Sequence, residues 1–399
     1  MQSERKISID FNDTEVAFRD LSTNSLKQIY LLFKVMNNRA WMNLSKHLID
    51  FAFTAGFPVK GLIKKTLYRH FVGGTSLEDS INVVERLARR NVCSIMDYAQ
   101  EGEESEDMFD ATCREVIRTV EFAREHARVP FSVFKITGVG RLELLSKVSE
   151  GHLLTGEEHA EYRRIEARVE AIFKRGYELG VPVMIDAEQT WIQPVLDDMV
   201  MGMMALYNKE RAIVQNTYQM YRHDSMDRLK HHHRKSIEGG FKFGLKIVRG
   251  AYMEKERERA LAMGYRSPIQ PDKASTDRDF NEVIRYMLKH VETIDFMVAT
   301  HNEESSLLLA GLIDEQGLPR DHPSIYFAQL YGMSDPITYH LADRGNNVAK
   351  YVPYGEVRTM MPYLFRRVEE NSSVKGQSSR ELSMIRAELR RRKSLTLIS

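Results

Sequence analysis

The chain has 399 residues, and 57 lysine and arginine residues balance 56 aspartate and glutamate residues. This balance argues against a nucleic-acid-binding protein, which would carry a basic surface. Its two cysteines, Cys93 and Cys113, form no CxxC spacing, which is typical of a reducing compartment. The polar first ten residues indicate no signal or transit peptide, and no apolar run reaches the roughly 20 residues of a membrane span. We expect a soluble, cytoplasmic protein. The sequence leaves open both peripheral contact with the inner face of a membrane and the oligomeric state.

Residues 1–90 are expected to form an N-terminal helical arm. Helix-period apolar patterns cover residues 25–38 and 41–56, and the second ends at Gly56 and Pro58, residues that commonly end helices. We predict that this arm packs on the domain that follows it, residues 91–371.

From residue 91 onward, short β-rich runs alternate with longer helical patterns. Most of the runs contain several consecutive apolar or β-branched residues, as expected for strands buried on both faces. They cover residues 91–98, 131–138, 181–188, 212–219, 244–252, 296–302, 324–333 and 348–355. Helix-period segments such as residues 161–180 and 275–291 separate them. Eight such repeats predict an α/β fold, a TIM-like (β/α)8 barrel.

The last segment, residues 372–399, reads as a basic amphipathic helix. Leu382, Ile385 and Leu389 fall on one side of it, among many arginines. Docking of this face on the rest of the chain is the ordinary explanation, and contact with a lipid surface or a partner is the alternative.

Polar or charged residues lie near the ends of nearly all the predicted strands. In a barrel of this type the active site is built at the carboxyl ends of the strands, so we expect these side chains to converge there. They are Lys135, Asp186, Glu188, Gln215, Lys246, Arg249, Tyr252, Thr300, His301, Asn302, Gln329 and Tyr351.

The pattern excludes several kinds of chemistry. We expect no metal site, because His301 has no second histidine at ligand spacing, and no serine or cysteine nucleophile with a nearby base is evident. There is no GxxxxGK[ST] phosphate loop, and GVGRLE at Gly138 lacks the third glycine of a dinucleotide fingerprint. What remains is a cationic pocket for an anionic substrate and a phosphate-bearing cofactor. A Schiff-base aldolase using Lys135 is the alternative from a different class.

A predicted helix after the last strand carries two adjacent arginines. Tyr363, Arg366, Arg367 and Glu370 stand at i, i+3, i+4 and i+7 and therefore share one face. Periodicity alone favours a solvated stripe on an amphipathic surface helix. The sharper interpretation is a clamp for a carboxylate.

Together these segments resemble the proline dehydrogenase family, closest to its monofunctional eukaryotic-type enzymes. The resemblance rests on FKITG, MIDAE, VQNTYQMY, KIVRGAYMEKERERA, VATHNE, FAQLYGM, KYVPYGEV and PYLFRRVEEN, which follow in order between residues 134 and 371. It implies a distorted (β/α)8 barrel that holds FAD without a Rossmann domain. It also implies oxidation of L-proline to 1-pyrroline-5-carboxylate, with electrons passed to a membrane quinone.

The resemblance also assigns roles by position. Arg366 and Arg367, helped by Lys135, would bind the proline carboxylate; Tyr351 and Tyr363 would shape the pocket; Asp186 would order Lys135; and Lys246 would stabilise negative charge on the flavin. FAD would be held by Gln215, Lys246, Arg249, Gly250, Ala251, Tyr252, Thr300, His301, Asn302, Gln329 and Leu330.

Three further points follow from the resemblance. Lys246 and Arg249 stand in the opposite order to the arginine and lysine of many bacterial relatives, which makes the geometry at Lys246 less secure. Tyr363 favours proline over hydroxyproline, because the hydroxyproline-oxidising branch has a smaller residue there. Glu101, in the loop after the first strand, is expected to pair with Arg366 as a gate.

Overall fold

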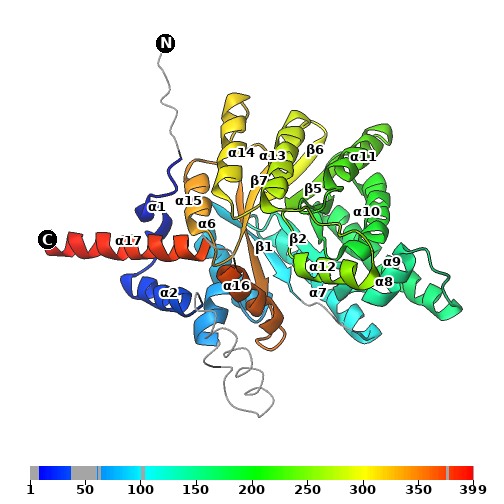
Figure 1. Ribbon diagram of the computed structural model, residues 1–399, viewed down its shortest axis with the longest axis horizontal. Helices are drawn as coiled ribbons and strands as arrows, with labels where there is room; N and C mark the ends of the chain where they lie inside the picture. The colour runs from blue at the N-terminus through cyan, green and yellow to red at the C-terminus, as the bar shows by residue number, and fades with distance from the viewer. Residues whose placement is uncertain (1–8, 37–60, 62–63, 100–103, 374–376, 399) are drawn as a thin grey trace.

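The computed structural model describes residues 9–36, 61, 64–99, 104–373 and 377–398. Its centre is a closed barrel of eight parallel strands in sequence order, with β8 paired to β1 (Figure 1). The strands are β1 Val92–Tyr98, β2 Phe131–Lys135, β3 Val183–Asp186, β4 Val214–Gln219, β5 Phe243–Val248, β6 Ile294–Ala299, β7 Ile325–Leu330 and β8 Val348–Tyr354. All eight predicted strands and the barrel are confirmed.

Helices follow the strands and surround the barrel. They are α7 Glu106–Glu125, α8 Leu142–Ser149, α9 Gly156–Leu179, α10 Gln193–Tyr207, α11 Ser225–Glu238, α12 Met253–Met263, α13 Lys273–Lys289, α14 Glu303–Glu315, α15 Asp335–Asp343 and α16 Met361–Ser373. Short 3-10 turns, η2 Ile136–Gly138 and η3 Thr190–Ile192, follow β2 and β3. Local sequence sets several helix starts: Thr155 and Glu158 form a capping box at α9, and Asp272 caps α13.

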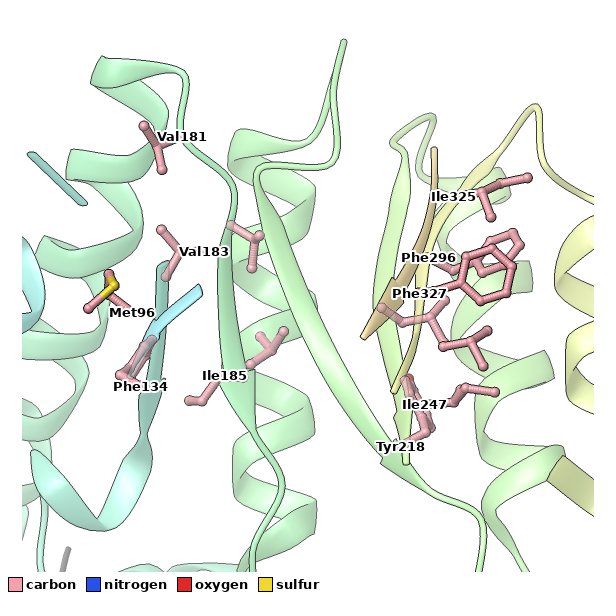
Figure 2. Packing of buried hydrophobic residues seen from close by; sticks show 14 of the residues in the cluster. Met96, Phe134, Val181, Val183, Ile185, Tyr218, Ile247, Phe296, Ile325 and Phe327 are labelled. Carbon is pink, nitrogen blue, oxygen red and sulfur yellow. The ribbon is translucent and has the colours of Figure 1, made fainter. Parts of the chain in front are cut away.

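The strands lie between an outer apolar layer and a smaller apolar cluster inside the barrel. Side chains on the outer face, including Phe296, Ile325 and Phe327, pack between the strands and the helices (Figure 2). A smaller cluster fills the barrel interior with Ile95, Phe131, Val133, Met184, Met297, Ala328, Ala349 and Tyr351. Because side chains alternate along a strand, the residues two positions beyond these face the same interior space. Lys135 lies two residues after Val133 and Asp186 two after Met184, so both point inward.

A second core joins the two ends of the chain. The N-terminal helices are α1 Thr14–Phe18, α2 Thr23–Met36, the π-helix η1 Lys64–Tyr68, α5 Arg69–Phe71 and α6 Leu77–Ala88. The C-terminal helix α17 Gln377–Ile398 runs between α1 and α2 (Figure 1). Phe18, Phe33, Leu364, Met384 and Ile385 share this core. The predicted helix over residues 25–38 is confirmed as α2, and the one over residues 41–56 lies outside the described residues.

The basic tail docks on the N-terminal helices. Glu388 is fully buried; it accepts a hydrogen bond from Thr14 at 2.9 Å and pairs with Arg391 and Arg392 on its own helix. Arg392 also donates to the backbone oxygen of Leu21 at 2.6 Å. The apolar face of α17 is therefore covered by the chain itself. Among the described helices, none is long and apolar enough to cross a membrane.

Candidate active site

A layer of alternating charges closes the barrel interior near the carboxyl ends of the strands. Asp186 Oδ2 lies 3.5 Å from Lys135 Nζ, and Lys246 Nζ donates to the other oxygen of the same carboxylate. Asp97 of β1 lies 3.7 Å from Lys135 Nζ on the other side. Burial would raise the pKa of Asp186, but the charges of Lys246 and Lys135 outweigh it and hold that pKa below its usual range. The layer therefore carries two ammonium groups and two carboxylates, whose side chains are between 4% and 17% exposed.

Tyr351 extends this layer across the barrel. Lys246 Nζ donates to Tyr351 Oη at 2.5 Å, and the hydroxyl points on to Met184 Sδ at 3.9 Å. The ammonium also lies 4.5 Å from the centre of the tyrosine ring. Burial, and then the charges of Asp186 and Asp97, raise the pKa of Tyr351 well above its ordinary value. The phenol is therefore neutral, and its ring forms an apolar wall beside the charges.

Arg249, the residue after β5, contacts side chains of α13 and α14. Its guanidinium donates to Asp277 at 2.7 Å, to Thr300 Oγ1 at 2.6 Å and to Ser305 Oγ at 3.1 Å. Thr300 Oγ1 in turn accepts from the backbone N–H of Asn302, whose side chain caps α14. The structure thus brings together Arg249, Thr300 and Asn302, three of the predicted cofactor residues.

Gly250 has a positive φ of 132°, and a Cβ built there would lie 2.6 Å from the ring of Tyr221. Only glycine fits such a backbone beside that ring. The planar group that closes on the backbone at this point is the chain's own Tyr221. Ala251 is exposed beside it, and Tyr252 begins α12.

His301 and Gln329 lie at the ends of β6 and β7. His301 Nδ1 is 2.9 Å from Ser334 Oγ, and burial, then the charges of Lys350, Arg367 and Arg249, lower the pKa of the imidazole to about 3. The imidazole is therefore neutral at physiological pH. Gln329 is buried and donates to the backbone oxygen of Thr300 at 3.3 Å.

The arginine pair on α16 is not a solvated stripe. Tyr363 and Arg367 are 5% and 6% exposed, and the guanidinium carbon of Arg367 lies 5.0 Å from the tyrosine ring centre. Arg366 is partly exposed beside them. The charge of Arg367 also helps to lower the pKa of the His301 imidazole. The solvated-stripe interpretation is wrong for Tyr363 and Arg367, because both side chains are buried.

Comparison with known proteins identifies the family. The family model described as "Proline dehydrogenase" matches residues 80–380, about three quarters of the chain. The chain belongs to the proline dehydrogenase family. "Proline dehydrogenase 1, mitochondrial" of Dictyostelium discoideum is 29% identical over a match that covers 98% of this chain and 76% of that protein. "Carbapenem antibiotics biosynthesis protein CarD" of Pectobacterium carotovorum subsp. carotovorum is 35% identical, with 81% and 83% covered.

A solved structure shares the fold. Proline utilization A from Bdellovibrio bacteriovorus, inactivated by N-propargylglycine, superposes with a TM-score of 0.70 at 21% identity. The match covers 92% of this chain and 38% of that chain. The likeness is one of architecture, the barrel with its added helices.

In this proline dehydrogenase family member, Gln215 and Glu101 differ from the other predicted site residues. Gln215 was expected at the carboxyl end of its strand, and this is wrong: it is the second residue of β4, pairs with Met184 and Gly244, and donates to the Ala212 oxygen at 3.2 Å. It faces the interior one layer below the charges. Glu101, the predicted gate, lies outside the described residues.

Several charged groups near the carboxyl ends of the strands were not predicted from the sequence. Asp97 is the second-last residue of β1 and Asp186 is the last residue of β3, so the sequence signal for Asp97, an acidic residue near the end of a strand, was present. Lys350 stands in an apolar strand; it is fully buried, pairs with Asp335 at 2.9 Å and donates to the Met333 oxygen at 2.5 Å. Glu381 reaches the barrel from α17, and no local pattern indicates this. Metal chemistry was not expected, and no cluster of three metal-ligating side chains occurs among the described residues.

Proposed function

We propose that the chain uses FAD to oxidise L-proline to (S)-1-pyrroline-5-carboxylate and passes the electrons to a membrane quinone, the first step of proline catabolism to glutamate. The family match over residues 80–380 supports the reaction class. The observation that carries the proposal is the largely buried layer of Lys135, Asp186 and Lys246, together with the arginine pair on α16, the helix that follows β8. A small zwitterion with one carboxylate suits this arrangement of charges.

The donor groups fit an anionic, flat cofactor. Lys246 offers a buried ammonium, Arg249 a guanidinium held by side chains of α13 and α14, and Thr300, His301 and Gln329 offer polar atoms at the ends of β6 and β7. We propose that these residues hold FAD with Gly250, Ala251, Tyr252, Asn302 and Leu330, and that Gln215 contributes from the layer below. When bound, FAD supplies the two-electron acceptor for the substrate hydride.

Substrate binding is proposed to use the residues of α16 and the charged layer. Arg366 and Arg367 bind the carboxylate, and Lys135 adds a third positive charge. Asp186 fixes Lys135 from 3.5 Å, while Tyr351 and Tyr363 give the pyrrolidine ring two apolar surfaces. Glu101 is proposed to cover the bound substrate through Arg366. Lys246, already bonded to Asp186 and Tyr351, keeps the cofactor side of the pocket positive.

The geometry disfavours the aldolase alternative. A Schiff-base lysine must be available as the neutral amine, but carboxylates stand 3.5 Å and 3.7 Å from Lys135 Nζ and favour its charged form. Oxidation of hydroxyproline stays the second candidate, since only the side chain of Tyr363 is expected to separate the two substrates.

Peripheral membrane contact is part of the proposal because a quinone acceptor lies in the bilayer. We propose that the protein works from the cytoplasmic side, on the inner face of the membrane. Several curated relatives are named as mitochondrial, among them the one from Dictyostelium discoideum. Fractionation of cells, with and without salt washing of the membranes, distinguishes soluble, peripheral and organellar locations.

The first test is an absorption spectrum of the purified protein before and after anaerobic addition of L-proline. We expect a flavin spectrum that bleaches with L-proline. Bleaching only with trans-4-hydroxy-L-proline would move the substrate to the hydroxylated ring and contradict the role of Tyr363. If protein supplied with FAD shows no flavin spectrum, the proposed oxidoreductase activity is wrong. The Schiff-base alternative would then be tested by trapping a carbonyl compound on Lys135 with borohydride.

A further inference from the structure

The first turn of α17 reaches two loops at the rim of the barrel. Arg380 pairs with Glu303, the first residue of α14, and the next residue, Glu381, accepts the backbone N–H of Ser334 at 2.5 Å. One loop follows β6 and contains His301, and the other follows β7 and contains Ser334. The C-terminal helix therefore holds the two loops that meet at His301.

Ser334 has an unusual backbone conformation. Its φ of 53° and ψ of 39° lie in the left-handed region, which is unfavourable for a residue with a side chain. Among the described residues, Asn91 is the other non-glycine residue with positive φ. This conformation lets Ser334 direct its N–H to Glu381 while its hydroxyl lies 2.9 Å from His301 Nδ1. A strained backbone that makes two specific polar contacts points to a role beyond the turn itself.

The same turn is held from the barrel side. Lys350, fully buried in β8, donates to the backbone oxygens of Met333 at 2.5 Å and Leu330 at 3.3 Å, and it pairs with Asp335 at 2.9 Å. The turn is thus fixed by a lysine beneath it and by a glutamate from α17 above it. With both contacts in place, the position of the Ser334 hydroxyl is set.

We propose that Glu381 and Ser334 are positioning residues that hold the imidazole of His301 in one orientation and one tautomer at the proposed cofactor site. The effect passes from Glu381 through the backbone N–H of Ser334 to its hydroxyl and then to Nδ1 of His301. The hydroxyl contact at Nδ1 limits rotation of the imidazole ring. The inference rests on the proposed function only in taking FAD as the ligand of that site.

The test compares Ser334→Ala, Glu381→Ala and Glu381→Gln with the unmodified protein. We expect Ser334→Ala and Glu381→Ala each to raise the dissociation constant of FAD by about tenfold, the effect of one buried hydrogen bond. Glu381→Gln retains an acceptor oxygen and should stay within about threefold. The double variant Ser334→Ala/Glu381→Ala should lose less affinity for FAD than the product of the two single fold-changes, because both residues act on His301 through the same contacts.

Glu388→Ala is the matched control on the same helix. Glu388 docks α17 on α1 but contacts neither loop at the rim. We expect it to lower the thermal unfolding midpoint and leave the affinity for FAD unchanged. If it weakens FAD binding as much as Ser334→Ala does, general docking of α17 explains the effect and the positioning role is wrong.

A flavin-independent measurement separates this inference from the proposed function. Nitrogen-15 NMR of labelled histidines reports the tautomer of His301 in protein without added FAD. We expect one tautomer in the unmodified protein and a mixture in Ser334→Ala. An unmodified protein that binds no FAD overturns the proposed function, and an unchanged His301 signal in Ser334→Ala overturns the positioning role.

Discussion

Lys246 and Tyr351 meet inside the barrel although their strands, β5 and β8, are not neighbours. Lys246 Nζ lies 2.5 Å from Tyr351 Oη, while β6 and β7 stand between the two strands around the wall. The contact therefore crosses the interior. It closes the top of the apolar cluster within the barrel and forms the floor on which substrate and cofactor are proposed to lie.

Tyr351→Phe tests this crossing contact. The ring and its position near the ammonium remain, but Lys246 loses a buried acceptor. We expect the free energy of unfolding to fall by about 1 kcal/mol and kcat/KM for proline to fall by about tenfold. Denaturant unfolding and steady-state kinetics measure the two effects. Tyr326→Phe, near the amino end of β7, is the control and should leave kcat/KM unchanged.

Asp186→Asn removes the carboxylate between two ammonium groups. Lys135 and Lys246 would then share the buried layer with Asp97 as the acidic partner. Breaking a buried ion pair from one side typically costs about 3–5 kcal/mol, so we expect a loss of that order in the free energy of unfolding and near-complete loss of proline oxidation. Asp314→Asn is the control: it removes the acidic partner of Arg320 and Arg344 near the end of α14, outside the charged layer. Equal losses in both variants would contradict a special role for Asp186.

The barrel could be predicted because its signal is local. Each strand is buried on both faces, so its apolar run stands out, and the intervening helices carry the 3.6-residue period. The convergence of Lys135, Asp186 and Lys246 also followed, since parallel strands bring their carboxyl ends to one side. Gln215 was misplaced because an apolar run does not fix which of its residues begins the strand.

What lies over a helix face could not be predicted. Periodicity groups Tyr363 with Arg367 but does not reveal that the N- and C-terminal helices build a second core there. Glu381 contacts Ser334, 47 positions earlier in the chain, through packing that no local pattern encodes. Lys350 was overlooked for the same reason: only the turn that it supports explains a fully buried lysine.

Arg366→Met and Arg367→Met test the carboxylate clamp. We expect each to raise KM for proline by roughly 100-fold, which corresponds to about 3 kcal/mol for a lost charge-assisted contact. Arg367→Met should also lower stability, because its guanidinium packs on the ring of Tyr363. Arg386→Met, at an exposed site on α17, is the control. A clamp variant with normal KM and a normal circular dichroism spectrum would contradict the proposed substrate site.

Acid should weaken the fold through buried neutral histidines. Burial, then the charge of His290, lowers the pKa of His233 from 6.5 to about 4; the ring contacts Tyr286 Oη at 2.8 Å and Thr293 Oγ1 at 2.9 Å. As pH falls below 6.5 the unfolded chain takes up the proton first, so this stabilisation is lost progressively down to about pH 4. His233→Gln should reduce the loss of stability between pH 7.5 and 5 by at most about 2 kcal/mol in denaturant titrations. An unchanged slope would mean that His233 is protonated in the folded protein.

Glu381 should act in the opposite direction. Burial and then the charge of Asp335 raise its pKa from 4.5 to about 7, while the N–H of Ser334 and the charge of Lys350 partly offset them. Between pH 4.5 and 7 the folded protein holds a proton that the unfolded chain has released, so this residue makes stability fall as pH rises through that interval. Glu381→Gln removes this titration. The free energy of unfolding of the variant, relative to that of the unmodified protein, should therefore be higher at pH 8 than at pH 5, by no more than about 3 kcal/mol. Unfolding curves of the variant and the unmodified protein at the two pH values measure this difference. A difference of the opposite sign would mean that Glu381 is ionised throughout and that Lys350 and the Ser334 N–H dominate its surroundings.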